Sequence, residues 1–237
     1  MAVCAGMLLV AALASPGSAA DYRLLQLNGN LVKWGKPALG QGAVITWALL
    51  DKASRYPDAL NCRAMVPLSP RLTAGPARAG LAVEELRRAF DSWSAAADIV
   101  IGAEAIPTGR AFSSVAYGDP ADAPERSVAA KALSPSARLG PGQGLSDTGP
   151  LAVKSIRQSL ICLNPEKTWK VGYDGNLDVY DLYFTFLHEI GHTIGLDHPG
   201  ASGEVMGFRY DEKVRGLQDG DVEAVRRLYG ERRSVAE

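Results

Sequence analysis

The stretch that decides the fold is His188-Glu189-Ile190-Gly191-His192-Thr193-Ile194-Gly195-Leu196-Asp197-His198, and it holds all three histidines of the chain. On a helix, His188 and His192 are one turn apart and project from the same face. Gly195 tolerates a positive φ, so the chain can leave the helix there and return His198 to the same point. Three histidine ligands leave a fourth position for water, which is the pattern of a catalytic zinc site. Glu189 follows the first histidine and can stand over the open side of the metal.

The length and composition suit a packed globular protein with one large domain or two small ones. The chain has 237 residues, 47% hydrophobic and 22% charged, so it can bury a core and does not resemble a disordered protein. The net charge is −1 with no block of like charges, which argues against a nucleic-acid partner. No segment is long and apolar enough to span a bilayer. We expect a single monomeric domain over residues 21–237, with a flexible tail at residues 231–237.

The N-terminus has the features of a secretory signal peptide over residues 1–20. An apolar run from Val3 to Ala14 is followed by a Pro-Gly pair, and small residues precede Asp21, where cleavage would fall. No Lys or Arg precedes the apolar run, which departs from the usual pattern. The alternative is the apolar N-terminus of a cytosolic protein. We expect export to the extracellular space or the periplasm.

The cysteine content fits export. Cys4 would leave with the signal peptide, while Cys62 and Cys162 would remain in the mature chain. An even pair of cysteines in an oxidising compartment predicts one disulfide, between Cys62 and Cys162. The alternative is two separate buried thiols. Neither interpretation leaves a third cysteine for redox chemistry.

Alternating and β-branched runs predict strands in the first half of the chain, and an apolar stripe at helical spacing predicts a helix. The expected strands are residues 22–27, 31–34, 43–50 and 99–101, and the expected helix is residues 81–97. Strand, helix and strand in this order indicate a crossover unit in a partly parallel sheet. The stretch 51–80 holds several Pro and Gly and is expected to be an excursion over the surface.

The second half of the chain predicts three more strands and two helices. The strands are residues 111–117, 127–133 and 159–163. Asp178 is predicted to cap a mostly apolar helix from residue 179 to about residue 194, which carries the first two histidines. A final helix runs from about Asp219 to Tyr229, because acidic residues open it and Gly230 ends it.

The stretch 188–198 resembles the extended zinc signature of the metzincins, in which a third histidine follows two on a helix. Met206 stands where metzincins carry a methionine in a turn beneath the zinc. Astacin-like and serralysin-like members place a tyrosine two residues later; this chain has Phe208, which favours the matrixins. Further matrixin-like segments, which extend the resemblance over residues 43–230, are 128–135, 167–169, 208–210 and 217–230.

The resemblance implies an α+β fold of the metzincin catalytic type. This fold is a mixed, twisted sheet of about five strands packed with helices, with a zinc-site helix and a small C-terminal subdomain that ends in a helix. The implied function is a secreted zinc endopeptidase, with Glu189 as the general base for zinc-activated water. Met206 would form an apolar floor under the histidines. The residues expected to contact a protein or peptide substrate are the edge-strand residues Val128, Ala129 and Ala130 and the pocket residue Tyr210.

The chain also departs from the matrixin pattern. No histidine remains for the second, structural zinc of animal matrixins, and Lys131 stands where one of its ligands would be, so we expect one zinc. Asp174, Asn176 and Asp178 could hold Ca²⁺, but their spacing favours roles in a turn and a helix cap. The segment Asn61-Cys62-Arg63 lacks the flanking pattern of an inhibitory prosegment.

Two other functions remain open at this point. One is a secreted, non-proteolytic zinc-binding or adhesion protein with a metzincin fold, and the other is a metal-dependent amide hydrolase of a non-peptide substrate. Glu189 argues against the first, since a binding protein has no need of a general base. The second shares all the chemistry of a protease. Core filler is the alternative for Met206, and Asp197 is expected to be a surface residue or a hydrogen-bond acceptor for a histidine.

Overall fold

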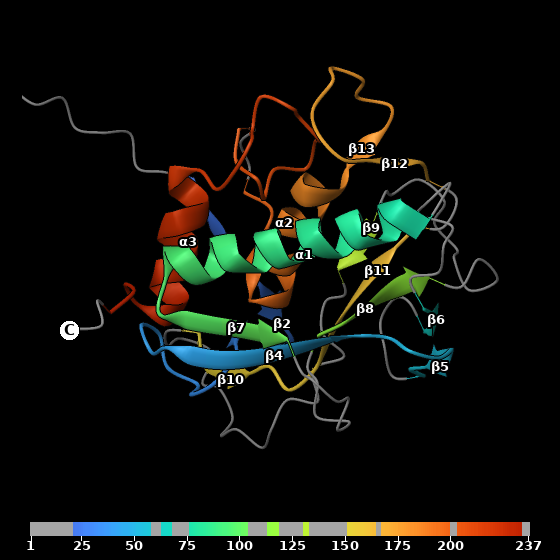
Figure 1. Ribbon diagram of the computed structural model, residues 1–237. Helices are drawn as coiled ribbons and strands as arrows, with labels where there is room; N and C mark the ends of the chain where they lie inside the picture. Colours follow the sequence, from blue (N-terminus) through green and yellow to red (C-terminus); the bar gives the residue numbers. More distant parts are fainter. Residues whose placement is uncertain are drawn as a thin grey trace, which may run out of the picture.

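The structure is a computed structural model (Figure 1). It describes residues 21–57, 63–67, 76–103, 113–118, 130–132, 151–164, 167–199 and 203–233. Several predicted features lie outside these ranges: the signal peptide at residues 1–20, Cys62, Val128, Ala129 and residues 234–237 of the tail. Within the described ranges, no helix has the length and apolar character needed to cross a membrane.

A seven-stranded mixed sheet forms one layer of the molecule. Strands β4 (Ala43–Leu49) and β7 (Ile99–Ala103) are parallel, and helix α1 (Pro76–Ala96) lies between them in the chain, as the crossover pattern predicted. Strand β8 (Ser113–Gly118) pairs in parallel with both β4 and β11 (Ser159–Leu163). The other three strands of this sheet are β5 (Ser54–Arg55), β6 (Ala64–Val66) and β9 (Ala130–Ala132).

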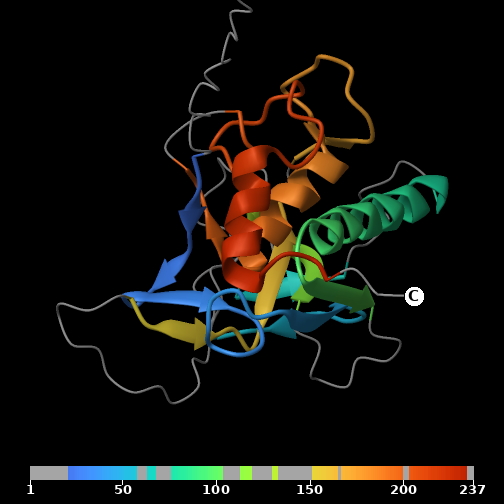
Figure 2. The ribbon, with the colours of Figure 1, turned by 90° about the vertical axis from the view of Figure 1, so that its left-hand side faces the viewer.

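The helices form the second layer. Helix α1, helix α2 (Leu182–Thr193) and helix α3 (Asp219–Tyr229) all lie on the same side of the sheet (Figures 1 and 2). The apolar stripe predicted for α1 faces α2, and the core between the helices and the sheet includes the fully buried side chains of Trp93, Phe186, Leu187 and Ile190. Burial of these large side chains fixes α2 as the central element of the fold.

The N-terminal residues run alongside the helical layer. Strands β1 (Arg23–Leu24), β2 (Gln26–Leu27) and β3 (Asn30–Lys33) belong to a segment that we call the N-terminal strap (residues 22–34). Asn28 and Gly29 have φ values of 49° and 73°, so they form a tight hairpin turn between β2 and β3 with both central residues in the left-handed region. The strap pairs with two later segments, β10 (Val153–Ser155) in parallel and β14 (Leu196–Asp197) antiparallel.

Three differences from the sequence predictions concern the main sheet and the helices α1 and α2. The sheet has seven strands rather than about five, because residues 51–80 contribute β5 and β6 instead of an irregular excursion. Helix α1 begins at Pro76 rather than residue 81, since proline suits the first helical position, which needs no N–H. Helix α2 is capped by Asp181 rather than Asp178, because the preceding residues Tyr180–Asp181 form the short strand β13 with β12 (Trp169–Lys170).

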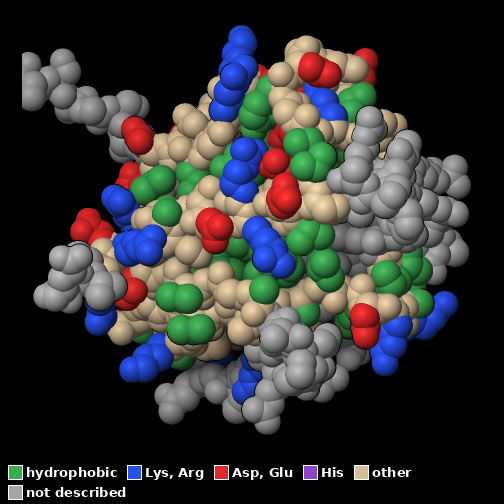
Figure 3. Space-filling model, in the orientation of Figure 1, with side chains coloured by type: hydrophobic (Ala, Val, Ile, Leu, Met, Phe, Trp, Pro, Cys, Tyr) green, Lys and Arg blue, Asp and Glu red, His purple; other side chains and the backbone are tan. Residues whose placement is uncertain are grey.

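The surface carries charges of both signs. On the face shown in Figure 3, Lys and Arg side chains lie among Asp and Glu side chains rather than in one continuous basic field. This distribution agrees with the near-zero net charge of the sequence.

Candidate metal centre

Helix α2 brings the first two histidines to the surface from a buried position. Every residue of α2 except His188 and His192 is buried. The carboxylate of Asp181 caps the helix by accepting the backbone N–H of Phe184 at 2.8 Å. The indole N–H of Trp93, from α1, donates to the carbonyl of Leu187 at 3.0 Å. The helix is therefore held at its start and in its middle, with only the two imidazoles left to reach outward.

The three histidines converge on one point. The Nε2 atom of His198 lies 3.1 Å from Nε2 of His188 and 3.2 Å from Nε2 of His192. The Nδ1 atoms of His188 and His192 face the carbonyl oxygens of Val205 and Leu196, at 2.7 and 2.9 Å. A carbonyl oxygen only accepts, so both Nδ1 atoms carry the proton and both Nε2 atoms present lone pairs to the same point.

This arrangement fits a metal ion. Three nitrogens at the zinc–nitrogen distance of about 2.0–2.1 Å around a tetrahedral ion lie roughly 3.3 Å apart, close to the separations found here. Burial lowers the pKa of His188 to about 3 and that of His192 to about 4, and it also lowers the pKa of His198. The imidazoles are neutral near pH 7 and available as ligands. Lone pairs this close repel one another unless a cation lies among them, so His188, His192 and His198 could hold a metal ion.

Met206 lies directly beneath this cluster. A Cβ placed on Gly191, between the two histidines of α2, would overlap with the sulfur of Met206. The side chain of Met206 is 2% exposed, and the neighbouring Val205 carbonyl is the acceptor for His188. The turn at residues 205–207 thus contacts α2 from below through both its side chain and its backbone.

The family now follows from comparison. The model of the matrixin family of peptidases matches residues 76–230, a range that includes α2, the three histidines, Met206 and α3. The chain belongs to the matrixin family. Human matrix metalloproteinase-26 is 36% identical over 56 residues, which are 22% of this chain and 22% of that protein. The chain therefore matches only a small part of the length of this curated relative. Its strap, at residues 22–34, precedes the region that the matrixin model matches.

The structure also locates three further residues that were predicted for the matrixin site: Glu189, Gly195 and Ala130. Glu189 is 5% exposed on α2, immediately after the first ligand. Gly195 has a φ of 104°, so it makes the left-handed turn that the sequence required of it. Ala130 lies in β9, which pairs antiparallel with β11 and ends the sheet on that side within the described residues.

Tyr210 makes more contacts within the protein than its predicted role in a substrate pocket requires. Its hydroxyl donates to Glu212 at 2.8 Å and accepts the backbone N–H of Asp181 at 3.1 Å. Its ring contacts the rings of Tyr180 and Phe184, with centroids 5.3 and 5.0 Å away. Tyr210 therefore lies against the start of α2, and its hydroxyl is used within the protein.

Three residues near the histidines were not predicted as part of the site or were placed only loosely. The exposed ring of Phe208 stacks on the imidazole of His198, with centroids 4.1 Å apart. Asp197 accepts the backbone N–H of His198 at 2.9 Å, so it is an acceptor for that histidine through its backbone. Asp221 is 2% exposed and accepts the backbone N–H groups of Val205 and Met206. The only sequence signal for Asp221 was its place at the start of a predicted helix, where negative charge suits the helix dipole.

A lysine ammonium occupies the place where a calcium ion was considered. Lys170 forms ion pairs with Asp174 and Glu212 and donates to the carbonyl of Asn176 at 2.7 Å. The backbone N–H of Asn176 donates to Asp174, and that of Asp178 donates to Asn176, which are the turn contacts that the sequence favoured. These carboxylates already have a cation partner.

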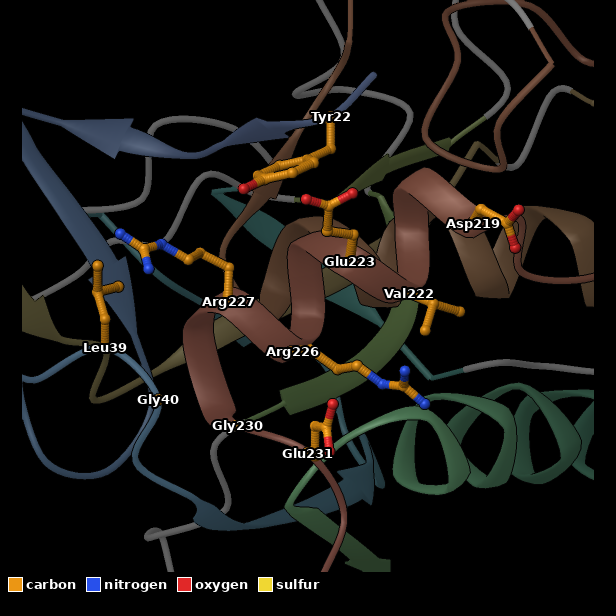
Figure 4. A pocket seen from close by; sticks show the side chains of 10 residues that line it. All are labelled: Tyr22, Leu39, Gly40, Asp219, Val222, Glu223, Arg226, Arg227, Gly230 and Glu231. Atoms are coloured by element: carbon orange, nitrogen blue, oxygen red, sulfur yellow. The ribbon is translucent and has the colours of Figure 1, made fainter. Parts of the chain in front are cut away.

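Two further features complete the description of the candidate residues. Cys162 is 4% exposed and is disulfide-bonded, while Cys62 lies outside the described residues, so the pairing of these two cysteines stays a prediction. An open hollow of about 670 Å³ lies between α3 and N-terminal residues that include Tyr22 and Leu39 (Figure 4). Its lining contains none of the three histidines, so it is separate from the metal centre.

Proposed function

We propose that this matrixin is a secreted zinc endopeptidase with a single catalytic zinc. The observation that carries the proposal is the convergence of the three Nε2 atoms, two of them fixed as lone-pair donors by backbone carbonyls. A zinc ion bound there would supply Lewis-acid polarisation of the scissile carbonyl and would make the attacking water more acidic. Among the described residues, three protein ligands are brought together, and a zinc ion held by three ligands would have room for substrate.

Glu189 is the general base in this proposal. It accepts the proton of the attacking water and passes it to the nitrogen of the leaving amine when the peptide bond breaks. Its position directly after His188 on a rigid, buried helix supports this role, because such a helix holds the carboxylate in one place relative to the ligands. The neighbouring floor formed by Met206 is apolar and offers no competing base.

The substrate would bind along β9. Within the described residues β9 ends the sheet on one side, and an extended peptide would pair with its backbone there. Residues 128–130 would provide the hydrogen-bonding groups with little demand on side-chain sequence. Strand β9 also lies close to α2, the helix that carries two of the histidines. Tyr210 would line the pocket for the substrate residue after the cleaved bond, through its ring rather than its bonded hydroxyl.

Export and a disulfide belong to the same proposal. Cleavage after residue 20 would release a chain that begins at Asp21, and oxidation would join Cys62 to Cys162. N-terminal sequencing and mass spectrometry of the exported protein, with and without reduction, test both points. If the exported protein still carries residues 1–20, export by this signal peptide is contradicted. If Cys62 and Cys162 are both free thiols, the disulfide is contradicted.

Cleavage of an unfolded protein such as casein tests the activity. The purified chain 21–237 is expected to cleave casein and to lose this activity with a zinc chelator. Glu189→Ala is expected to reduce the rate by about 10²–10⁴-fold while retaining zinc. Glu223→Ala, which removes an exposed carboxylate from α3, is the matched control and is expected to behave as wild type.

Two results would contradict the proposal. Equal rates for wild type and Glu189→Ala would exclude the general-base role. Two zinc ions per chain by elemental analysis would contradict the single site. New amino termini in the products identify peptide-bond hydrolysis and separate it from hydrolysis of a non-peptide amide.

A further inference from the structure

The C-terminal end of helix α2, which carries His188 and His192, is held by hydrogen-bond donors from two distant parts of the chain. The last carbonyl groups of any helix lack partners within the helix. Here the carbonyl oxygens of residues 193–195 each accept one hydrogen bond from outside the turn. Their donors, in order, are the indole N–H of Trp34 at 2.7 Å, the hydroxyl of Tyr229 at 2.7 Å and the backbone N–H of Leu25 at 2.8 Å. The next carbonyl, of Leu196, accepts Nδ1 of the ligand His192.

Tyr229 joins the two ends of the chain at this point. It comes from α3, is fully buried, and its hydroxyl accepts the backbone N–H of Trp34 at 3.0 Å while donating to Ile194. One oxygen atom therefore connects the strap, α3 and the end of α2. The ammonium of Lys33 lies 4.7 Å from the centroid of the Tyr229 ring and keeps that ring in place from the other side.

The strap continues from this point to the third ligand. Strand β1 pairs with β14, with Arg23 opposite Asp197 and Leu24 opposite Leu196. The Arg23 guanidinium lies 3.3 Å from one carboxylate oxygen of Asp197, and the other oxygen accepts the backbone N–H of His198 at 2.9 Å. Strand pairing, an ion pair and a hydrogen bond thus connect the strap to His198.

The contact between the strap and the turn is also close. A Cβ on Gly195 would overlap with the carbonyl oxygen of Val32, so this glycine lets the two backbones touch. The turn at residues 193–197 sets the direction in which His198 leaves α2, and its last carbonyl orients His192. Displacing the strap or Tyr229 would therefore move two of the three ligands.

We propose that Tyr229 and the N-terminal strap are positioning residues for the metal site, which set His192 and His198 for zinc binding through the turn at residues 193–197. This inference rests on the proposed zinc site. It adds that the geometry of the site depends on a segment that precedes the region matched by the matrixin model. Second-layer groups of this kind typically change metal affinity by about 10–100-fold.

Tyr229→Phe tests the inference by removing only the hydroxyl. The matched control is Tyr183→Phe, because Tyr183 is a buried tyrosine of α2 whose hydroxyl pairs with Ser92 at 2.9 Å, away from the turn. Zinc affinity is measured by competition with a chelator, and ligand geometry by the visible absorption of the cobalt(II)-substituted protein. We expect about tenfold weaker zinc binding and shifted cobalt bands for Tyr229→Phe, with the control like wild type.

A second variant, at the protein surface, tests the inference independently of any folding defect in Tyr229→Phe. Arg23→Ala removes the ion pair with Asp197, and Arg233→Ala is its control, since Arg233 is an exposed arginine that pairs with Asp98 at 3.4 Å. We expect Arg23→Ala to weaken zinc binding about two- to threefold without changing the urea midpoint of the metal-free protein, and Arg233→Ala to leave zinc binding unchanged.

The inference is overturned if Tyr229→Phe and Arg23→Ala bind zinc as tightly as their controls, or if their cobalt spectra match wild type. These measurements need no cleavage. A protein that binds zinc normally but cleaves nothing would defeat the proposed function and leave the positioning role intact. An active enzyme whose zinc affinity is unchanged in both variants would leave the proposed function intact and defeat the positioning role.

Discussion

The backbone N–H of Met206 donates to the carboxylate of Asp221 at 3.1 Å. The other carboxylate oxygen accepts the N–H of Val205 at 2.9 Å, and the Val205 carbonyl in turn accepts Nδ1 of His188. The first turn of α3 therefore fixes the methionine turn, and the methionine turn holds the imidazole of His188. The connection links two segments that the matrixin resemblance describes separately, as a floor and as a closing helix.

Asp221→Asn is expected to destabilise the protein by about 1–3 kcal/mol, because the amide nitrogen cannot accept and leaves one buried N–H without a partner. Urea unfolding of the metal-free chain measures this free energy. Asp219→Asn, at an exposed position in the same helical turn, is the control and is expected to change stability by less than about 0.5 kcal/mol. Equal stability of the two variants would refute the link from Asp221 to the methionine turn.

Gly195→Ala is expected to weaken both stability and zinc binding. The residue has a φ of 104°, and a Cβ would meet the carbonyl of Val32. The control is Gly203→Ala, because Gly203 has a nearly equal φ of 107° with nothing within 4 Å of an added Cβ. Backbone strain of about 1–3 kcal/mol is common to both variants, so any further loss in Gly195→Ala reports the contact with the strap. Identical losses would show that this contact contributes nothing.

Gly191→Ala is expected to destabilise the protein by about 1–3 kcal/mol through overpacking, since the new methyl overlaps with the sulfur of Met206. Combining it with Met206→Ala removes the clash. The double variant should therefore lose less stability than the sum of the two single variants, as measured in a double-mutant cycle by urea unfolding. Strict additivity would mean that the two side chains do not meet.

Lys33 gives the stability a defined pH dependence. Its ammonium is fully buried and donates to the carbonyls of residues 34, 36 and 41 at 2.8–2.9 Å, and burial lowers its pKa from 10.5 to about 8. Between these values the unfolded chain holds the proton that the native state has lost. For this group, the free energy of unfolding therefore rises with pH from 8 to 10.5 and is flat below pH 8.

Lys33→Met removes this dependence. From pH 8 to 10.5, the free energy of unfolding of wild type should rise relative to that of the variant by roughly 2–3 kcal/mol. Urea unfolding of both proteins at a series of pH values gives this difference, and other titrating groups cancel in it. A difference that stays constant over the window would show that Lys33 titrates with an ordinary pKa in the native state.

The sequence predicted the elements whose signals are local. The strand at residues 159–163 and the helix at residues 219–229 have the predicted bounds, because a β-branched apolar run and a pair of helix-end signals each lie within a few residues. The histidine spacing predicted the convergence of His188, His192 and His198 for the same reason, since one helical turn and one glycine turn determine it.

Contacts between distant residues gave no such signal. Trp34 and Tyr229 are 195 residues apart in the sequence. Nothing in the sequence around either residue indicates that the two side chains donate to neighbouring carbonyl groups at the end of α2. Lys33 reads as a polar residue of an alternating strand, yet it is fully buried, because its three protons find three carbonyl groups in the following loop. Strand β14 is only two residues long and exists because the strap supplies its partner.

The hydrogen bonds of the Tyr229 hydroxyl limit when, during synthesis, the proposed metal site can be completed. A ribosome makes the strap before the histidines, and it makes Tyr229 after them. The turn that carries His198 obtains its full set of hydrogen bonds only once the first and last parts of the domain are both present. A nascent chain that has not reached Tyr229 therefore lacks the hydroxyl that holds this turn, and the proposed metal site is completed only after α3 has been made.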